Sequence, residues 1–178
     1  NMTVFVPCDP TEMEKAVFAA AEIDGPVYIR VARPVCEDIT TEDTPFIPGK
    51  ANILKDGNDV CIITMGLMVP IALKAAEMLE AEGISAAVVN MHTVKPIDAE
   101  TILAMNEKCK GIVTAEEHSV IGGLGSAVAE VLAGHAGAKF ERVGIQDKFG
   151  KSGKPDEQFA AYGLTAENIV EKCKATLA

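Results

Sequence analysis

Short runs of consecutive apolar residues, separated by segments whose apolar residues recur at helical spacing, constrain the fold of this chain more than any other feature. The segments VCIITM (60–65), AAVVNM (86–91) and IVTAE (112–116) lack the alternation of apolar and polar residues that is typical of a strand with one solvent-exposed face. Between the first two, apolar residues recur at helical spacing over 69–79. Strands buried on both faces need helices on both sides of a mostly parallel sheet. The sequence therefore predicts an α/β fold with three layers, αβα, over residues 50–178.

The first 34 residues predict a strand–helix–strand unit. Strands are expected at 3–6 and 27–32, and a helix should begin at Pro10 because Asp9 is a capping residue followed by proline and then Glu12. This unit is too small to bury its own core. We expect it to pack on a later segment or on an upstream part that precedes Asn1.

Residues 35–49 are rich in proline and acidic residues and have no sustained apolar period, which is typical of a linker. We therefore expect a division into 1–34, the linker 35–49 and a second domain over 50–178. At the start of that domain, NILK (52–55) and the run 60–65 flank the turn-forming tetrad Asp-Gly-Asn-Asp. This spacing predicts a hairpin, and with it one antiparallel edge strand.

The charge excludes several classes of function. Lys plus Arg is 16 and Asp plus Glu is 26, a net charge of −10, which repels nucleic acid and anionic lipid surfaces. Neither a membrane span nor a signal peptide is apparent, so we expect a cytoplasmic location. The five cysteines contain no CxxC pair and lie mostly in apolar runs, so we expect reduced core residues.

A glycine-rich run, Gly122 to Gly125, follows a strand and opens a helix. It partly matches a dinucleotide fingerprint, but the third glycine is missing and carboxylates precede the turn. A tight turn with close helix packing is the favoured interpretation. Glu116 and His118 end the preceding strand, where α/β sheets place ligand-contacting groups, and His92 follows another strand. For each of them, a satisfied loop residue is the more frequent case.

Two arginines, Arg30 and Arg33, stand near the end of the strand expected at 27–32. Strand alternation sends residues three apart to opposite faces, so at most one should enter a given cleft. An arginine beside a domain boundary can hold a phosphate or carboxylate through two hydrogen bonds. An ion pair with the acidic linker is an equally good interpretation.

Four segments together, 4–34, 53–79, 88–102 and 114–132, resemble the transketolase family in order and spacing. The likeness is greatest to the C-terminal section of a split transketolase. It implies that residues 1–34 are the tail of the pyrimidine-binding domain and that 50–178 are the transketolase C-terminal domain.

The resemblance also implies an activity, the transfer of a two-carbon ketol unit between sugar phosphates, as in the pentose phosphate pathway. Thiamine diphosphate with Mg²⁺ is the family's cofactor, and its sites would lie outside this chain, so the isolated chain should be inactive. The implied partners are an N-terminal transketolase subunit and a second copy in a homodimer. Arg33 matches the family's substrate-phosphate arginine, while Arg30, His92, Glu116 and His118 are secondary candidates.

One departure from related enzymes bears on the choice of reaction. Deoxyxylulose phosphate synthases and some 2-oxoacid dehydrogenase beta subunits place an arginine where this chain has His92. This favours a split transketolase over the synthase, and a 2-oxoacid dehydrogenase beta subunit stays an alternative. A purely structural or regulatory assembly module is the alternative from a different class.

Overall fold

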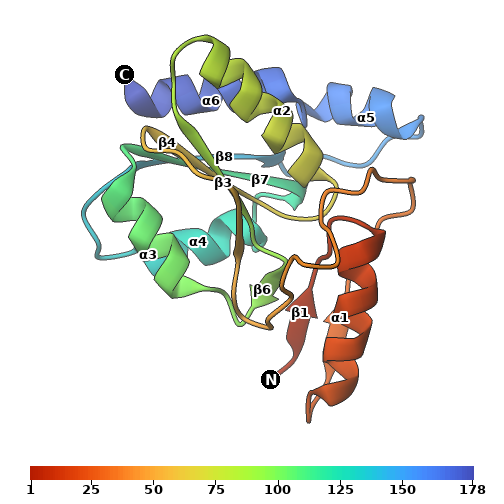
Figure 1. Ribbon diagram of the computed structural model, residues 1–178. Coiled ribbons are helices and arrows are strands. Elements are labelled where there is room, and N and C mark those ends of the chain that lie inside the picture. The colour runs from red at the N-terminus through yellow and green to blue at the C-terminus, as the bar shows by residue number, and fades with distance from the viewer.

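The computed structural model describes residues 1–178 and contains two sheets of unequal size (Figure 1). The larger sheet has the strand order β3-β5-β4-β7-β8. Its last four members run parallel, and β3 is an antiparallel edge strand. The bounds are β3 (Asn52–Lys55), β4 (Val60–Thr64), β5 (Ala86–Asn90), β7 (Gly111–Ser119) and β8 (Lys139–Ile145).

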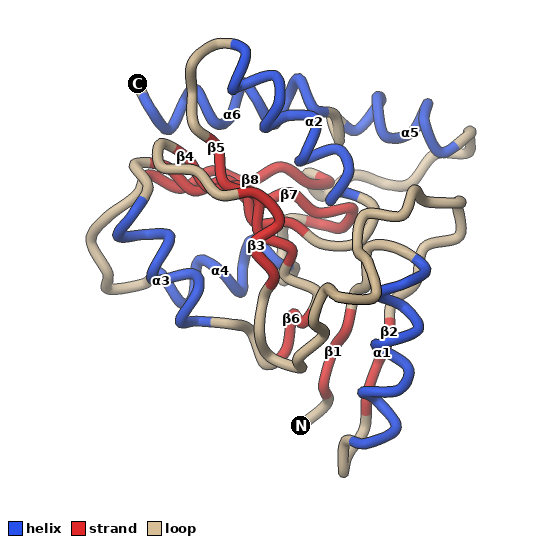
Figure 2. Tube along the Cα trace, in the orientation of Figure 1, coloured by secondary structure: helices blue, strands red, loops and turns tan.

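Helices cover both faces of this sheet (Figures 1 and 2). The helices are α2 (Met68–Ala81), α3 (Ala99–Lys108), α4 (Leu124–Leu132), α5 (Pro155–Tyr162) and α6 (Ala166–Leu177). Alternate residues of β4 enter two separate cores: Val60 and Ile62 pack with α2 and α6, whereas Cys61 and Ile63 pack with α3 and α4. Because both faces are covered, every residue of β4 is buried. The predicted three-layer αβα fold is confirmed.

The prediction of a hairpin between β3 and β4 is wrong, although the prediction of an antiparallel edge strand is confirmed. β3 pairs with β5, with Ile53 opposite Val89, and β5 separates it from β4. The backbone at Gly57 crosses the start of β5 so closely that a Cβ there would lie 2.3 Å from the backbone of Ala86. The Asp-Gly-Asn-Asp tetrad therefore carries the chain over β5 instead of reversing it beside β3.

The smaller sheet has the order β2-β1-β6 and carries helix α1 (Pro10–Glu22). Its strands are β1 (Thr3–Phe5), β2 (Val27–Ile29) and β6 (Thr93–Lys95); β2 is parallel to β1 and β6 is antiparallel. The first 34 residues thus pack on a later segment, as expected. The strand predicted to reach residue 32 ends at Ile29, because β1 offers no partner beyond Phe5, whose carbonyl accepts the Arg30 N–H.

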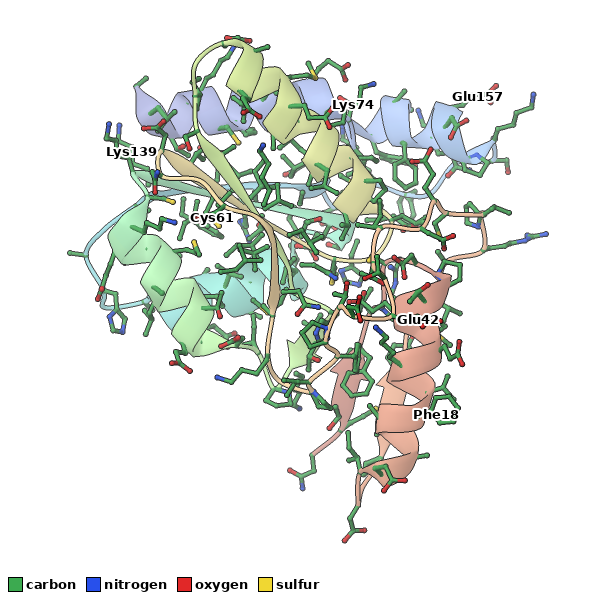
Figure 3. All side chains as sticks on the ribbon, in the orientation of Figure 1. Phe18, Glu42, Cys61, Lys74, Lys139 and Glu157 are labelled. Atoms are coloured by element: carbon green, nitrogen blue, oxygen red, sulfur yellow. The ribbon has the colours of Figure 1, made fainter.

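No helix or strand occurs between Ile29 and Asn52, yet this segment is tied to α1. The Asp9 carboxylate caps α1 by accepting from the Glu12 N–H, and it also accepts from the backbone and hydroxyl of Thr40. The Lys15 ammonium donates to three backbone carbonyls of residues 41–44, so Glu42 lies beside α1 (Figure 3). This segment is therefore held in one place without regular structure.

Four of the five cysteines are buried and all are free thiols, with Cys61 in the middle of the larger sheet (Figure 3). Cys36 departs from the expected core location, because it lies half-exposed in the segment between β2 and β3. None of the helices combines the length and apolar character that crossing a membrane requires.

Candidate functional site

The carboxyl ends of the larger sheet's strands are covered by the N-terminal segment. α/β sheets usually bind ligands at this edge. Here the Val6 N–H donates to the His92 carbonyl at 2.8 Å, just past the end of β5. A Cβ at Gly66, just past the end of β4, would lie 3.1 Å from the Val6 side chain. The usual ligand edge of this sheet is therefore an internal contact, and ligand-binding groups must be sought at its margin.

A buried carboxylate, Glu12, links α1 to the end of β5. Only 2% of Glu12 is exposed; its carboxylate accepts the Cys8 N–H and the Asn90 side-chain amide, both at 2.8 Å. Burial raises the pKa of Glu12, while these hydrogen bonds act in the opposite direction. Burial, followed by the nearby Glu12 charge, also raises the pKa of the Cys8 thiol far above its usual range. Cys8 is accordingly unsuited to act as a nucleophile.

Arg30 joins the end of β2 to the end of β7. Its guanidinium donates to the Glu117 carbonyl at 2.9 Å and lies 3.5 Å from the Glu117 carboxylate. Both side chains are about one-quarter exposed. Arg30 is thus already engaged within the chain.

Arg33 lies beyond the end of β2, so strand alternation does not set its direction, and it takes no part in the Arg30 contact. It is exposed, it forms neither an ion pair nor a side-chain hydrogen bond, and it lines a pocket of about 320 Å³ with Met13 and Cys36. Asp9 also lines this pocket, but its carboxylate is occupied by Glu12 and residues 39–40. The alternative interpretation, an ion pair with the acidic segment 35–49, is wrong, because no such pair forms. Arg33 therefore keeps an uncompensated guanidinium that is able to bind an anion.

Glu116 explains the glycine-rich run. Its side chain is fully buried, and its two oxygens accept the N–H groups of Leu124 and Gly125 at 2.7 and 2.8 Å, at the start of α4. A Cβ at Gly123 would lie 2.0 Å from the same carboxylate. Burial raises the pKa of Glu116, against the effect of the two N–H groups. The helix N-terminus that a phosphate would need is thus filled by the chain's own carboxylate.

His118 and His92, the two candidate histidines, occupy opposite environments. His118 is 47% exposed and its Nδ1 lies 3.8 Å from the Glu116 carboxylate, but it makes no hydrogen bond with Arg30 or Arg33. His92 is fully buried, and its ring stacks on Phe46 at 4.2 Å between centroids. Burial lowers the pKa of His92 to about 4. Of the two, only His118 is accessible to a ligand.

Sequence reasoning missed two residues that shape this region, Glu12 and Phe46. Glu12 was assigned only to helix capping, although it is one of the largest fully buried side chains. Phe46 contacts both His92 and Phe5, the latter edge-on at 5.1 Å between centroids. The one available signal was an aromatic residue in an otherwise polar, proline-rich segment.

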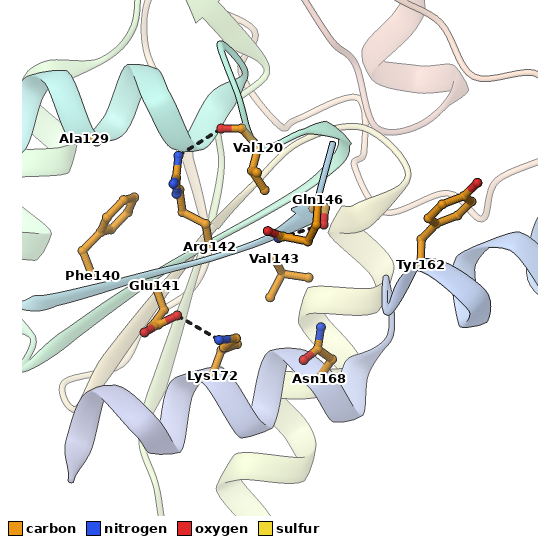
Figure 4. A pocket seen from close by; sticks show the side chains of 11 residues that line it. Val120, Ala129, Phe140, Glu141, Arg142, Val143, Gln146, Tyr162, Asn168 and Lys172 are labelled. Carbon is orange, nitrogen blue, oxygen red and sulfur yellow. Dashed lines mark hydrogen bonds and ion pairs between the residues drawn. The ribbon is translucent and has the colours of Figure 1, made fainter. Parts of the chain in front are cut away.

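A second cavity, of about 660 Å³, lies between β8 and α6 (Figure 4). Its charged groups are bonded within the chain: Glu141 pairs with Lys172 at 3.0 Å, and Arg142 donates to the Val120 carbonyl at 3.0 Å. No group of three or more His, Cys, Asp or Glu side chains is arranged to hold a metal ion. Arg33 is consequently the arginine best placed to bind an anionic ligand.

The fold is that of an α/β protein in which the chain's own N-terminal segment covers the carboxyl edge of the larger sheet. Comparison with known proteins identifies the family. Residues 49–169 match the family model described as transketolase, C-terminal domain. The chain belongs to the transketolase family. A 6-deoxy-6-sulfo-D-fructose transketolase subunit from Clostridium sp. (strain MSTE9) is 46% identical over 96% of this chain and 53% of its own length. A putative transketolase C-terminal section from Methanocaldococcus jannaschii is 47% identical over 97% of this chain and 54% of its own length.

A solved structure resembles the whole chain. It is described as a split gene transketolase, inactive beta4 tetramer, with a TM-score of 0.96, 48% identity, and coverage of 99% of this chain and 58% of that one. The chain thus spans about half the length of these relatives. A 1-deoxy-D-xylulose-5-phosphate synthase from Symbiobacterium thermophilum is 36% identical over 99% of this chain but only 28% of its own length.

Proposed function

We propose that this chain is the C-terminal part of a transketolase, which transfers a two-carbon ketol unit between sugar phosphates. In this proposal residues 1–34 are the tail of the pyrimidine-binding domain, 35–49 the linker and 50–178 the C-terminal domain. The observation that carries it is the state of Arg33. Of the three arginines, Arg30 and Arg142 are bonded within the chain, and Arg33 alone is free.

Arg33 would bind the phosphate of the sugar. A planar guanidinium presents two parallel N–H donors to phosphate oxygens, and such charge-assisted bonds are stronger than neutral ones. Fixing the phosphate end of the substrate orients the distant carbonyl without contact at the reacting atoms. Arg33 would thus set affinity and position, not the chemical step.

The described residues do not fit the cofactor that the family implies. Thiamine diphosphate with Mg²⁺ needs carboxylate or carbonyl ligands for the metal and donors for the diphosphate. No suitable cluster of side chains is present, and the N-terminus of α4 is occupied by Glu116. We therefore place both cofactor sites in the rest of the enzyme and assign no catalytic step to this chain, which would be inactive by itself.

The proposed partners are an N-terminal transketolase subunit and a second copy of this chain. The relatives are about twice as long as this chain. The similar solved structure is described as an inactive beta4 tetramer. Both facts support a role that depends on assembly.

A reconstitution assay tests the proposal. The full C-terminal polypeptide is mixed with the matching N-terminal subunit, thiamine diphosphate and Mg²⁺, and ketol transfer from xylulose 5-phosphate to ribose 5-phosphate is followed. Transfer that requires both polypeptides is expected. Ketol transfer without the C-terminal polypeptide would contradict the proposal and favour a purely structural or regulatory module.

A second candidate, 1-deoxyxylulose-5-phosphate synthase, is favoured by its match to nearly all of this chain. His92 argues against it, because it replaces the arginine that these synthases carry in the strand-end motif. The position is fully buried against Phe46, where a charged guanidinium would need a partner. Consumption of pyruvate with glyceraldehyde 3-phosphate, without ketol transfer, would establish the synthase. Lipoyl-dependent activity would instead indicate a 2-oxoacid dehydrogenase beta subunit.

A further inference from the structure

The loop between β8 and α5, residues 147–154, presents an aromatic side chain to solvent. Phe149 is 98% exposed. The loop backbone is nevertheless anchored, because the Tyr162 hydroxyl donates to the Phe149 carbonyl at 2.8 Å and the Gln158 amide donates to the Gly153 carbonyl at 2.9 Å. Phe149 is thus held outward by its own backbone contacts, and its burial would require another surface.

An apolar groove of about 720 Å³ lies beside this loop, between α2, α5 and residues 34–39. Leu67, Ile71 and Phe159 line it, and Val35 at its margin is fully exposed. Figure 1 shows that the loop and the segment 34–39 lie at the same end of the molecule as α5. Phe149 is not among the lining residues, so the groove is not filled by the chain's own loop.

The loop and the groove carry opposite charge. The loop has Lys148, Lys151 and Lys154 against Asp147, a net charge of +2 in a chain whose net charge is −10. The groove has Glu37, Glu77 and Asp156 against Lys74, a net charge of −2. None of these side chains forms an ion pair within the chain. The loop therefore complements the groove in two ways: its aromatic side chain matches the apolar lining, and its lysines match the acidic residues of the groove.

We propose that the loop 147–154 of one copy of this chain docks in the groove of a second copy, with Phe149 in the groove and the lysines over its acidic rim. The loop leads directly into α5, which forms one wall of the groove, so a two-fold axis can satisfy both contacts at once. This inference rests on the self-association in the proposed function and assigns a surface to it. A buried aromatic residue is a typical anchor of such an interface.

Complementary charge reversal in the full polypeptide tests the surface. The loop variant carries Lys148→Glu and Lys151→Glu, and the groove variant carries Glu37→Lys and Glu77→Lys. In either variant alone, like charges oppose each other at both contacts, and the dissociation constant measured by sedimentation equilibrium should rise about tenfold or more. In an equimolar mixture both contacts have opposite charges, so mixed dimers should form with close to native affinity. Native mass spectrometry separates the mixed dimer from the two homodimers.

The apolar part of the contact has its own variant. Phe149→Ser should weaken self-association about tenfold or more, because the anchor is lost while the fold is untouched. Ile53→Ser, at a half-exposed position on β3, is the matched control and should leave the dissociation constant unchanged. A monomeric native chain, an undiminished affinity in the charge variants, or a failure of the mixture to recover affinity would overturn the proposal. These readouts need neither cofactor nor substrate, so they stand apart from the outcome of the ketol-transfer assay.

Discussion

The guanidinium of Arg30 donates to the backbone carbonyl of Glu117 at 2.9 Å and lies 3.5 Å from its carboxylate. This contact joins the small sheet to the larger one across 87 residues of sequence. Together with the Glu12–Asn90 bond at the end of β5, it closes the sheet edge at which ligands usually bind. Arg33, three residues further along, takes no part in it, so two neighbouring arginines have separate roles.

Substitution of these arginines should separate stability from function. Arg30→Ala removes the ion pair with the Glu117 carboxylate and leaves the Glu117 backbone carbonyl without its donor, which should lower the free energy of unfolding by about 1–2 kcal/mol. Arg33→Ala removes an exposed side chain that makes no hydrogen bond, and it should change the free energy of unfolding by less than about 0.5 kcal/mol. Urea denaturation of both variants checks this. Equal losses would mean that Arg33 is also part of the fold.

Gly123 should tolerate no side chain. In Gly123→Ala the new Cβ would lie 2.0 Å from the Glu116 carboxylate and 2.7 Å from the Ser119 carbonyl, so the buried cap of α4 must shift. A loss of about 1–3 kcal/mol in unfolding free energy is expected, as for other overpacked sites. Gly150→Ala is the control, because no atom lies within 4 Å of a Cβ there. A melting temperature for Gly123→Ala equal to that of the control would show that the cap is looser than described.

Glu12 should make stability depend on pH in a particular direction. Its folded pKa lies above the ordinary value of 4.5, so its favourable contribution is complete below pH 4.5 and declines as the pH rises through the folded pKa. Relative to Glu12→Gln, which does not titrate, the native chain should therefore lose stability as the pH rises. Denaturation curves at several pH values measure this difference. Glu14→Gln, an exposed site on the same helix, serves as the control; a constant difference for Glu12→Gln would contradict the raised pKa.

His92 should make the free energy of unfolding depend on pH in the opposite direction. Its pKa falls from 6.5 to about 4 because the ring is buried, so its contribution is present above pH 6.5 and is lost as the pH falls through about 4. This lowering of the His92 pKa corresponds to about 3 kcal/mol of unfolding free energy, lost once the ring is protonated in both states. Compared with His92→Gln, the native chain should lose up to this amount between pH 6.5 and 4. His135→Gln, at an exposed position, should show no such trend.

Sequence reasoning succeeded where one local signal dominated. Consecutive apolar residues at 60–64 and 86–90 identified strands buried on both faces, because runs this short are typical of strands covered by helices on both sides. Asp9 followed by Pro10 and Glu12 located the start of α1, since the cap bond is made within four residues. The family resemblance was likewise confirmed.

The failures are features decided by distant contacts. The partner of β3 depends on how the chain crosses β5 at Gly57, which no short segment encodes. β6 has three residues and forms because β1 offers it an edge. α5 has no fully buried residue, and only Phe159 and Tyr162 pack partly buried against the core, so its apolar signal is short. The sequence also could not predict whether Arg33 forms an ion pair, because the choice between an ion pair and a free guanidinium depends on where residues 35–49 are held.

The role of Arg33 is the central claim, and the reconstituted enzyme tests it most directly. In Arg33→Ala the Michaelis constant for a phosphorylated ketose donor should rise about tenfold or more, because a charge-assisted hydrogen bond contributes about 1.5–3 kcal/mol. The constant for an unphosphorylated donor should change less than about twofold, since that donor never makes the contact. Equal changes for the two donors would contradict the account.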